Sequence, residues 1–396
     1  MSEKMNIKLN NNFSRLRESY LFAEIRERIE EFKAKNGNEH EKRIISLGIG
    51  DVSLPLSACV CTEMERAARE MGTSLGFHGY GDTQGEPSLR DAISKRYGKR
   101  GIDLSADEIF ISDGAKSDLG NLNDVLGDNE VVICDPVYPV YLDSAIISGR
   151  RVRLLTAKGE NGFLPSSKSL SKKPRVIFLC SPNNPTGVTF SREEIKGWVD
   201  HALFCGSLII FDAAYESYIR EEPLPHSIFE IEGARKCAIE VCSFSKMAGF
   251  TGVRCGWTAI AKENPLYKLW KRRQNTKFNG ASYIAQRGAL AALSSEGARE
   301  CALNIDYYME NARLLAALLR KKKISFVGGV NAPYLWAKCP RGMSSWELFD
   351  HLLNEARVVV TPGVGFGRAG EGWFRLSSFG SQHDIFEAIE RLERTL

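Results

Sequence analysis

Short apolar runs that stop at polar residues constrain this chain more than any other feature of its sequence. Residues 176–179 (Val-Ile-Phe-Leu) precede a proline-rich turn that contains Asn184, and residues 208–211 (Leu-Ile-Ile-Phe) end at Asp212. A continuous apolar run of this length is typical of a strand buried on both faces of a parallel sheet. Asn184, Asp212 and Lys246 follow one another at intervals of roughly 30 residues, about one strand–helix–strand step each. The spacing predicts that successive elements deliver these side chains to one edge of a sheet.

Lys246 lies in a segment rich in hydroxyl and glycine residues, Ser-Phe-Ser-Lys-Met-Ala-Gly-Phe-Thr-Gly-Val-Arg-Cys-Gly-Trp from 243 to 257. Ser243 and Ser245 come just before the lysine, and Arg254 comes eight residues after it. A lysine amine can form a Schiff base with an aldehyde cofactor, and hydroxyl donors with a fixed cation suit a phosphate group. The segment therefore predicts that pyridoxal phosphate (PLP) binds covalently to Lys246.

Polar residues at the predicted strand ends supply what the cofactor ring needs. A buried carboxylate requires a cationic partner, so Asp212 is predicted to keep the pyridine nitrogen protonated and able to draw electrons into the ring. Tyr215 and the amide of Asn184 are predicted to donate to the phenolic oxygen of the ring. Upstream, the strand pattern at 108–112 runs into Asp-Gly-Ala-Lys. The main-chain amides around Ala115 are predicted to open a helix and hold the phosphate.

Motifs along nearly the whole chain resemble one family of PLP enzymes. The lysine and asparagine–proline segments resemble those of fold type I aminotransferases in general. The motifs at 112–116 (Ser-Asp-Gly-Ala-Lys), 278–282 (Phe-Asn-Gly-Ala-Ser) and 362–367 (Pro-Gly-Val-Gly-Phe-Gly) resemble more closely the LL-diaminopimelate aminotransferases. The resemblance implies an α/β fold of type I, with a mainly parallel central sheet in a large domain and a smaller α+β domain.

The periodicity of the chain is consistent with two lobes. At 396 residues, the chain is long for one domain. Helical and strand patterns alternate between residues 53 and 285, which are predicted to form the large PLP-binding domain. Residues 286–396 combine a long helical pattern with short strands near 324–326, 334–338 and 373–377, and are predicted to form the small carboxyl-terminal domain. Residues 1–52 are predicted to be an amino-terminal arm that joins the small domain.

The resemblance also assigns residues to the substrate pocket. The planar guanidinium of Arg375 suits bidentate binding of the substrate α-carboxylate. In the resembled family, Gly50 contacts the substrate through its main chain, and Tyr80 crosses a dimer interface to the phosphate, which implies a homodimer with shared sites. The predicted catalytic residues are Lys246, Asp212 and Tyr215. The predicted substrate-binding residues are Tyr20, Gly50, Lys116, Tyr138, Asn184, Asn279 and Arg375. The predicted cofactor-binding residues are Tyr80, Ala115, Lys116, Tyr138, Asn184, Asp212, Tyr215, Ser243, Ser245, Lys246, Arg254 and Asn279.

The resemblance implies transamination between LL-diaminopimelate and 2-oxoglutarate, with the amine of Lys246 moving the α-proton. One position departs from the family. Its members usually carry an acidic residue for the distal ammonium of the substrate where this chain has Thr83, although Asp82 or Glu86 in the same loop could replace it. Alternatives are a general dicarboxylic or aromatic amino acid aminotransferase, a PLP-dependent lyase, and a non-catalytic PLP-binding regulator.

Composition argues against several other classes of protein. A net charge of +4 is small for this length and gives no argument for nucleic-acid binding. No apolar run approaches ~18 residues and the amino terminus has no apolar signal region, so we expect no membrane segment and no secretion. Ten cysteines without paired spacing are expected to be reduced thiols of a cytoplasmic protein. The six histidines show no metal-ligand spacing, and no metal site is predicted.

Overall fold

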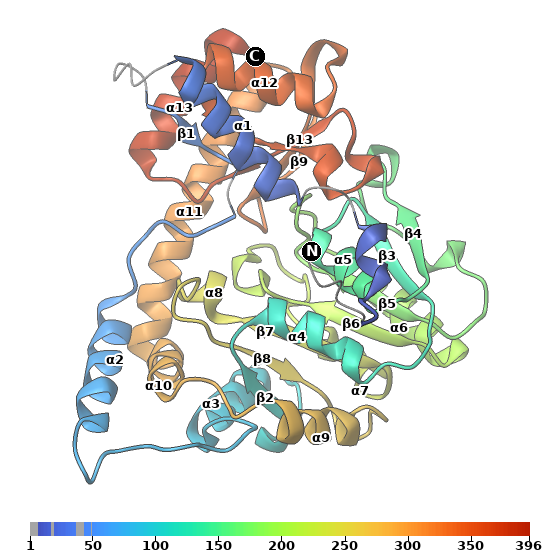
Figure 1. Ribbon diagram of the computed structural model, residues 1–396, viewed down its shortest axis with the longest axis vertical. Helices are drawn as coiled ribbons and strands as arrows, with labels where there is room; N and C mark the ends of the chain where they lie inside the picture. The colour runs from blue at the N-terminus through green and yellow to red at the C-terminus, as the bar shows by residue number, and fades with distance from the viewer. Residues whose placement is uncertain (1–6, 17–19, 37–42, 49) are drawn as a thin grey trace, which may run out of the picture.

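A seven-stranded sheet forms the centre of the larger lobe of the computed structural model, which describes residues 7–16, 20–36, 43–48 and 50–396 (Figure 1). The strands lie in the order β2 (Ile109–Ser112), β8 (Gly256–Ala259), β7 (Ala238–Ser243), β6 (Leu208–Asp212), β5 (Val176–Cys180), β3 (Val131–Asp135) and β4 (Val152–Thr156). The strands from β7 to β4 are parallel, whereas β8 is antiparallel to both of its neighbours. The predicted mainly parallel sheet is confirmed, and its antiparallel part lies at the β2 edge.

Helices cover both faces of this sheet because its strands are apolar on both sides. Ile209 and Phe211 of β6 pack in one apolar cluster, while Ile210 between them packs in a second cluster on the opposite face. The first cluster includes side chains of α3 (Pro87–Gly98) and α6 (Arg192–Cys205). The second includes side chains of α4 (Ala115–Asn121), α5 (Pro139–Ile147) and α9 (Tyr267–Lys277). The remaining helices of this lobe are α2 (Ala58–Met71), α7 (Ala234–Cys237), α8 (Phe244–Met247) and α10 (Tyr283–Ala292).

Helix α6 shows how local sequence sets the bounds of an element. The hydroxyl of its N-cap residue, Ser191, accepts a hydrogen bond from the backbone N–H of Glu194 at 3.2 Å, and the Glu194 carboxylate accepts from the Ser191 N–H at 2.7 Å. Gly206 ends the helix with a φ of 65°, a left-handed conformation that favours glycine. Local sequence thus determines where α6 begins and where it ends.

The smaller lobe contains a four-stranded antiparallel sheet, in the order β12 (Thr361–Pro362), β13 (Trp373–Ser377), β10 (Tyr334–Lys338) and β9 (Phe326–Gly328). Beside it, β1 (Ile45–Ser46) pairs in parallel with β11 (Val358–Val359). The helices are α1 (Leu21–Asn36), α12 (Ser345–Glu355) and α13 (Gln382–Thr395). Apolar residues of α1 pack in one cluster with residues of α12 and β10, so α1 lies on the small lobe, whereas the short turn η1 (Asn11–Arg15) contacts α5 of the large lobe. The residue boundaries proposed for the domains stay predictions.

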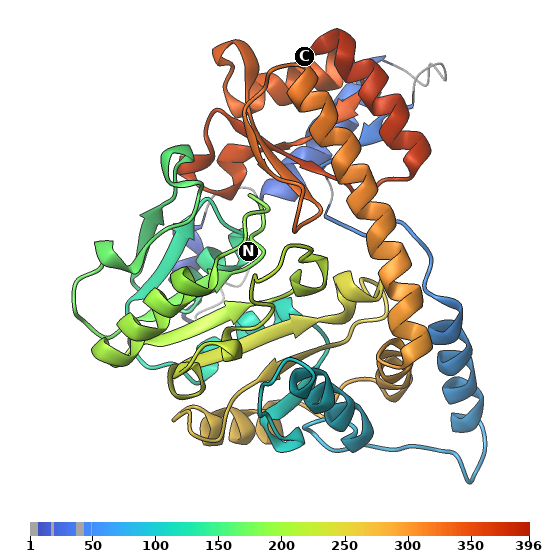
Figure 2. The same ribbon diagram turned by 180° about the vertical axis from the view of Figure 1, so that it is seen from behind.

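One long helix belongs to both lobes. Helix α11 (Ser295–Lys321) contacts α2, α8 and α10 at its beginning and α13 and β10 farther along (Figure 2). The long helical pattern predicted from residue 286 is thus two helices, α10 and α11, separated by Leu293 and Ser294. The strand predicted near 324–326 begins later, at Phe326.

Candidate active site

A cavity of about 330 Å³ opens where β5, β6 and β7 end, at the side facing the small lobe. Its walls come from segments that are far apart in the sequence, as the spacing of the strand ends predicts. The predicted site residues that line it are Gly50, Ala115, Lys116, Tyr138, Asn184, Asp212, Tyr215, Ser243, Ser245, Lys246, Arg254 and Arg375. One chain therefore brings together most of the predicted site.

Lys246 lies on α8, the short helix that directly follows β7. Its Nζ donates a hydrogen bond to the main-chain carbonyl of Gly50. Burial lowers the pKa of the Lys246 ammonium to about 8, with the positive charges of Arg375 and Arg254 acting in the same direction and Asp51 opposing them. A buried amine with this pKa is neutral, and hence nucleophilic, in a sizeable fraction of molecules near neutral pH.

Asp212 ends β6 and is 5% exposed. Its carboxylate accepts a hydrogen bond from the Tyr141 hydroxyl at 2.5 Å and from the backbone N–H of Ala214 at 3.0 Å. Burial raises the pKa of the Asp212 carboxyl. No ion pair joins Asp212 to a cationic side chain within the described ranges. A carboxylate in this position fits a protonated ring nitrogen, which would supply the missing positive charge.

Arg375 lies on β13 and is 1% exposed. Its guanidinium donates to Asn184 Oδ1 at 2.7 Å and to the carbonyl of Gly48 at 2.6 Å, while Nε is buried with no hydrogen-bond partner. Burial lowers the pKa of this guanidinium. No carboxylate pairs with it among the residues that the structure describes. The cavity thus holds a buried cation suited to a substrate carboxylate.

Gly50 is a position where close approach requires glycine. A Cβ at this residue would lie 2.6 Å from the hydroxyl of Tyr334 and 3.7 Å from Arg375 Nη2. Because any side chain here would displace the tyrosine, the main chain of Gly50 itself forms the cavity wall.

Hydroxyl and cationic groups gather at the end of the cavity formed by α4 and the segment after β7. Arg254 Nη1 donates to Ser245 Oγ at 3.2 Å, and Ser243 Oγ accepts from the Ser245 N–H at 3.0 Å. A Cβ at Gly114, whose φ is 137°, would lie 2.4 Å from Arg254 Nη2. Glycine is therefore needed for the arginine to approach the start of α4. These groups fit the phosphate of PLP in their chemistry, with a cation and two hydroxyls beside exposed main-chain amides.

Three predicted residues do not line this cavity. Tyr80 is 90% exposed and Asn279 is also exposed, each on a loop outside the cavity wall. Tyr20 lies at the rim, where Lys116 Nζ is 5.7 Å from the centre of its ring. Within one chain, the structure does not bring Tyr80 and Asn279 to Lys246.

Several wall residues were not predicted from the sequence. Tyr141 contacts Asp212 and stands three positions after Tyr138, so helical spacing offered a signal for it. The Tyr334 hydroxyl lies 2.7 Å from that of Tyr215, and no local pattern marks it because it comes from a strand of the other lobe. Phe22, Asp51 and Thr251 also line the cavity.

Two other structural features concern membrane segments and metal sites, neither of which is predicted from the sequence. None of the helices in the described part of the chain combines the length and apolar character that a membrane crossing requires.

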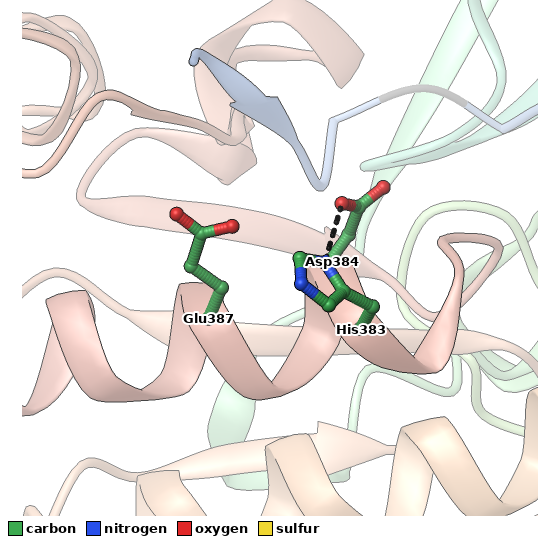
Figure 3. Close-up of side chains that lie close together, drawn as sticks. All are labelled: His383, Asp384 and Glu387. Atoms are coloured by element: carbon green, nitrogen blue, oxygen red, sulfur yellow. Dashed lines mark ion pairs between the residues drawn. The ribbon is translucent and has the colours of Figure 1, made fainter. Parts of the chain in front are cut away.

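Figure 3 shows His383, Asp384 and Glu387 on α13. The potential ligand atoms of these three side chains lie within 4.8 Å of one another. Asp384 pairs with Arg43 and Glu387 pairs with Arg391. We assign this cluster no metal-binding role because arginines already neutralise its carboxylates.

Comparisons with known proteins agree with this geometry. Residues 42–392 match the family model of class I and II aminotransferases. The chain is 49% identical to an LL-diaminopimelate aminotransferase of Bacteroides fragilis, over 98% of this chain and 99% of that protein. It is 48% identical to the one of Prochlorococcus marinus over the same shares. Its structure resembles that of L,L-diaminopimelate aminotransferase from Chlamydomonas reinhardtii, with a TM-score of 0.92 and 40% identity over 98% of this chain and 99% of the other.

The structural match confirms the predicted fold class, because the two chains share their fold over almost their whole length. The family model spans both lobes, from β1 through most of α13. Relatives that are nearly half identical along almost the whole chain exclude a chance likeness of isolated motifs. The chain therefore belongs to the class I and II aminotransferases, a family of PLP-dependent transaminases.

Proposed function

We propose that this transaminase is an LL-diaminopimelate:2-oxoglutarate aminotransferase that binds PLP covalently through Lys246. The proposal rests on three buried groups in the cavity: an amine of lowered pKa, a carboxylate that pairs with no cationic side chain and a guanidinium that pairs with no carboxylate, as far as the described residues extend. The high identity to relatives named for this activity supports the choice of substrate.

The residues present fit PLP in three places. Arg254, Ser243 and Ser245 would hold its phosphate, together with the main chain at Ala115. Asp212 would hold the proton on its ring nitrogen. The Asn184 side-chain oxygen already accepts from Arg375, which leaves the Asn184 NH₂ group to donate to the ring's phenolic oxygen, beside Tyr215. When bound, PLP supplies an aldehyde for the amino group and a ring that accepts electrons.

The protein's own groups then perform distinct tasks. Arg375 binds the α-carboxylate of the substrate and fixes its orientation, since a planar guanidinium holds both carboxylate oxygens. Lys246 Nζ takes the proton from the α-carbon, because its amine is buried and largely free of charge at slightly alkaline pH. The aromatic walls formed by Tyr138, Tyr141 and Tyr334 exclude water from this region.

The proposal includes a homodimer with shared active sites. Leu75, Phe77 and Tyr80 are exposed by 103%, 67% and 90%, all within one loop after α2. Three large exposed side chains so close together are typical of a surface that another subunit covers. In the dimer, Tyr80 and Asn279 would complete the partner's cavity.

The cysteines support a cytoplasmic location, which is also part of the proposal. All ten cysteines are unpaired, and most of them are buried in the apolar core. Reduced, buried thiols are typical of proteins that work in a reducing compartment.

A general dicarboxylic amino acid aminotransferase is the second candidate, favoured by the environment of Thr83. Its hydroxyl donates to Asn275 Oδ1 at 2.5 Å, and it brings no charge for a distal ammonium. Asp82 is held by Arg90, with 3.1 Å between the two groups. The loop of one chain therefore offers no free carboxylate at these two positions.

Single-turnover half reactions distinguish the two candidates. The PLP-loaded enzyme is mixed with LL-diaminopimelate, glutamate, aspartate or phenylalanine in turn, and the absorbance of the cofactor is followed. We expect rapid conversion by LL-diaminopimelate and glutamate, and slow conversion by the other two. Conversion by glutamate and aspartate without conversion by LL-diaminopimelate would assign the second candidate, and no conversion by any amino acid would refute both.

A further inference from the structure

A second cavity, of about 580 Å³, lies on the opposite side of the loop that carries Tyr215. It opens between α3, the short turn η6 (Glu216–Tyr218) and the beginning of α11, and both helices can be followed in Figure 2. None of the catalytic residues lines it, and it is separate from the site of transamination.

The two long walls of this groove differ in chemistry. The wall formed by α3 and the loops beside it is cationic, and it carries Lys95, Arg96, Lys99, Arg100 and Arg220, with His226 beside them. The opposite wall, from α11, is apolar, with Ala298, Cys301 and Ile305 facing the groove. No acidic side chain lines the groove in the part of the chain that the structure describes.

Nearby carboxylates neutralise only part of this charge. Glu216 is buried behind the groove and accepts hydrogen bonds from Arg96 and Arg100. Asp306 pairs with Arg220. Lys95 and Lys99 are exposed and pair with no acidic group within the described residues. Two carboxylates thus face five cationic side chains, whose mutual repulsion a bound anion would relieve.

We propose that this groove binds an organic anion that carries several negative charges at one end and an aromatic or apolar body at the other. The charged end lies against α3, where Lys95 and Lys99 are free to pair with it. The body lies against the apolar wall of α11. A volume of about 580 Å³ is within the range of small-molecule sites in proteins.

The position of the groove links it to the active site. The Tyr218 hydroxyl donates to the main-chain carbonyl of Lys246 at 3.1 Å, and Met247 lines the groove. An anion on α3 also competes with Glu216 for Arg96 and Arg100, and Glu216 directly follows Tyr215. The bound anion therefore acts on the loop that carries a predicted catalytic residue.

The test uses the protein loaded with PLP and then freed of unbound PLP by dialysis, so that the phosphate end of the active site is filled while the groove stays empty. Isothermal titration calorimetry compares ADP, which has both parts of the ligand, with pyrophosphate, the charge alone, and adenosine, the body alone. We expect ADP to bind with one site per chain and more tightly than pyrophosphate, and adenosine not to bind. Equal binding of ADP and adenosine, or no binding of ADP, would overturn the proposal.

A matched pair of variants localises the site. Lys95→Ala/Lys99→Ala removes two unpaired, exposed cations, and we expect it to weaken ADP binding by about tenfold or more. Lys168→Ala/Lys172→Ala removes two exposed lysines at the same spacing elsewhere on the surface, and ADP affinity should stay within about twofold. Equal losses of ADP affinity in both variants would show that ADP responds only to the overall charge of the protein. Unchanged affinity in Lys95→Ala/Lys99→Ala would show that ADP binds outside this groove. Transaminase activity of both variants without ADP should match the parent, which shows that each is folded.

Discussion

The cavity at the strand ends and the loop of residues 72–86 hold parts of one predicted site, but they hold their side chains very differently. Arg375 and Asp212 are 1% and 5% exposed, and each is fixed by hydrogen bonds to neighbouring groups. Tyr80 is 90% exposed, with no contact to the cavity of its own chain. One chain thus brings together the groups that we predict to react, whereas the loop side chains would gain their surroundings only in the proposed dimer.

The first and largest expected effect tests the cavity itself. Lys246→Ala removes the buried amine of lowered pKa that we propose for covalent attachment, so turnover should fall by roughly 10,000-fold or more. The protein should stay folded and lose the absorbance band of covalently bound PLP. Borohydride reduction of the parent followed by peptide mapping checks the same point, and a label on another lysine would refute the assignment.

Asp212→Asn should lower turnover by roughly 1,000-fold, because a neutral amide cannot hold a proton on the ring nitrogen. Affinity for PLP should change far less, since the phosphate contacts stay in place. Steady-state kinetics and PLP titration measure the two quantities separately. Turnover within a few-fold of the parent would make Asp212 a structural residue of the strand end.

The lowered pKa of Lys246 predicts a pH profile for its reactivity. In the PLP-free protein, modification of this amine should increase with a midpoint near pH 8 instead of 10.5, because burial favours the neutral form. Between these two pH values the unfolded chain binds the proton and the folded chain does not, so the contribution of Lys246 to stability rises with pH in this range. Mass spectrometry of the modified peptide measures the midpoint, and a value near 10.5 would contradict the burial of the amine.

Complementation between two inactive variants tests whether the loop of one subunit completes the site of the other. Tyr80→Ala and Lys246→Ala, each inactive alone, should form mixed dimers with one intact site when they are mixed and allowed to exchange subunits. Random pairing would restore about a quarter of the parent activity. Co-purification of the two variants through different affinity tags confirms the exchange. A fully active monomer at the assay concentration, or exchange without recovery, would show that one chain completes its own site.

The smallest expected effect concerns substrate choice by the loop. Asp82 and Glu86 are the two loop residues that could replace the family's acidic residue. In the described structure Arg90 pairs with Asp82 and not with Glu86. The Glu86 Oε1 atom lies 3.3 Å from the position that a Cβ of Gly81 would occupy. Glu86→Gln should raise the KM for LL-diaminopimelate by about tenfold and leave that for glutamate unchanged. Asp82→Asn is the matched control, with the same loss of charge next to Arg90. A larger effect of the control would transfer the role to Asp82.

Sequence alone predicted the elements that local pattern determines. The apolar runs at β5 and β6 and the residues that follow them placed Asn184 and Asp212 at one edge, since parallel strands end on the same side of a sheet. Contacts between elements that are far apart in the sequence leave no local pattern from which they could be predicted. Nothing near Tyr334 predicts that it meets Tyr215, because the packing of β10 against the other lobe decides it.

The pairing of β2 shows the same limit. Its apolar pattern predicted a strand, but that pattern does not reveal its neighbour in the sheet, which is β8, a strand that runs antiparallel to both β2 and β7. The pairing of Asp82 with Arg90 likewise depends on how α3 folds back on the loop before it. The roles assigned to the site residues stay predictions, although most of these residues share one cavity.

Helix α11 connects the two lobes as one rigid element. Its 27 residues span about 40 Å as one continuous rod, from the large lobe at Ser295 to the small lobe at Lys321. Because a rod does not shorten, a change in the angle between the lobes must turn it near the cap at Ser294. A turn of about 5° there would move its far end by about 3.5 Å, a little more than the length of a hydrogen bond. The small lobe carries Arg375 on β13, so a rotation of this size between the lobes is enough to alter its hydrogen bond to Asn184 of the large lobe.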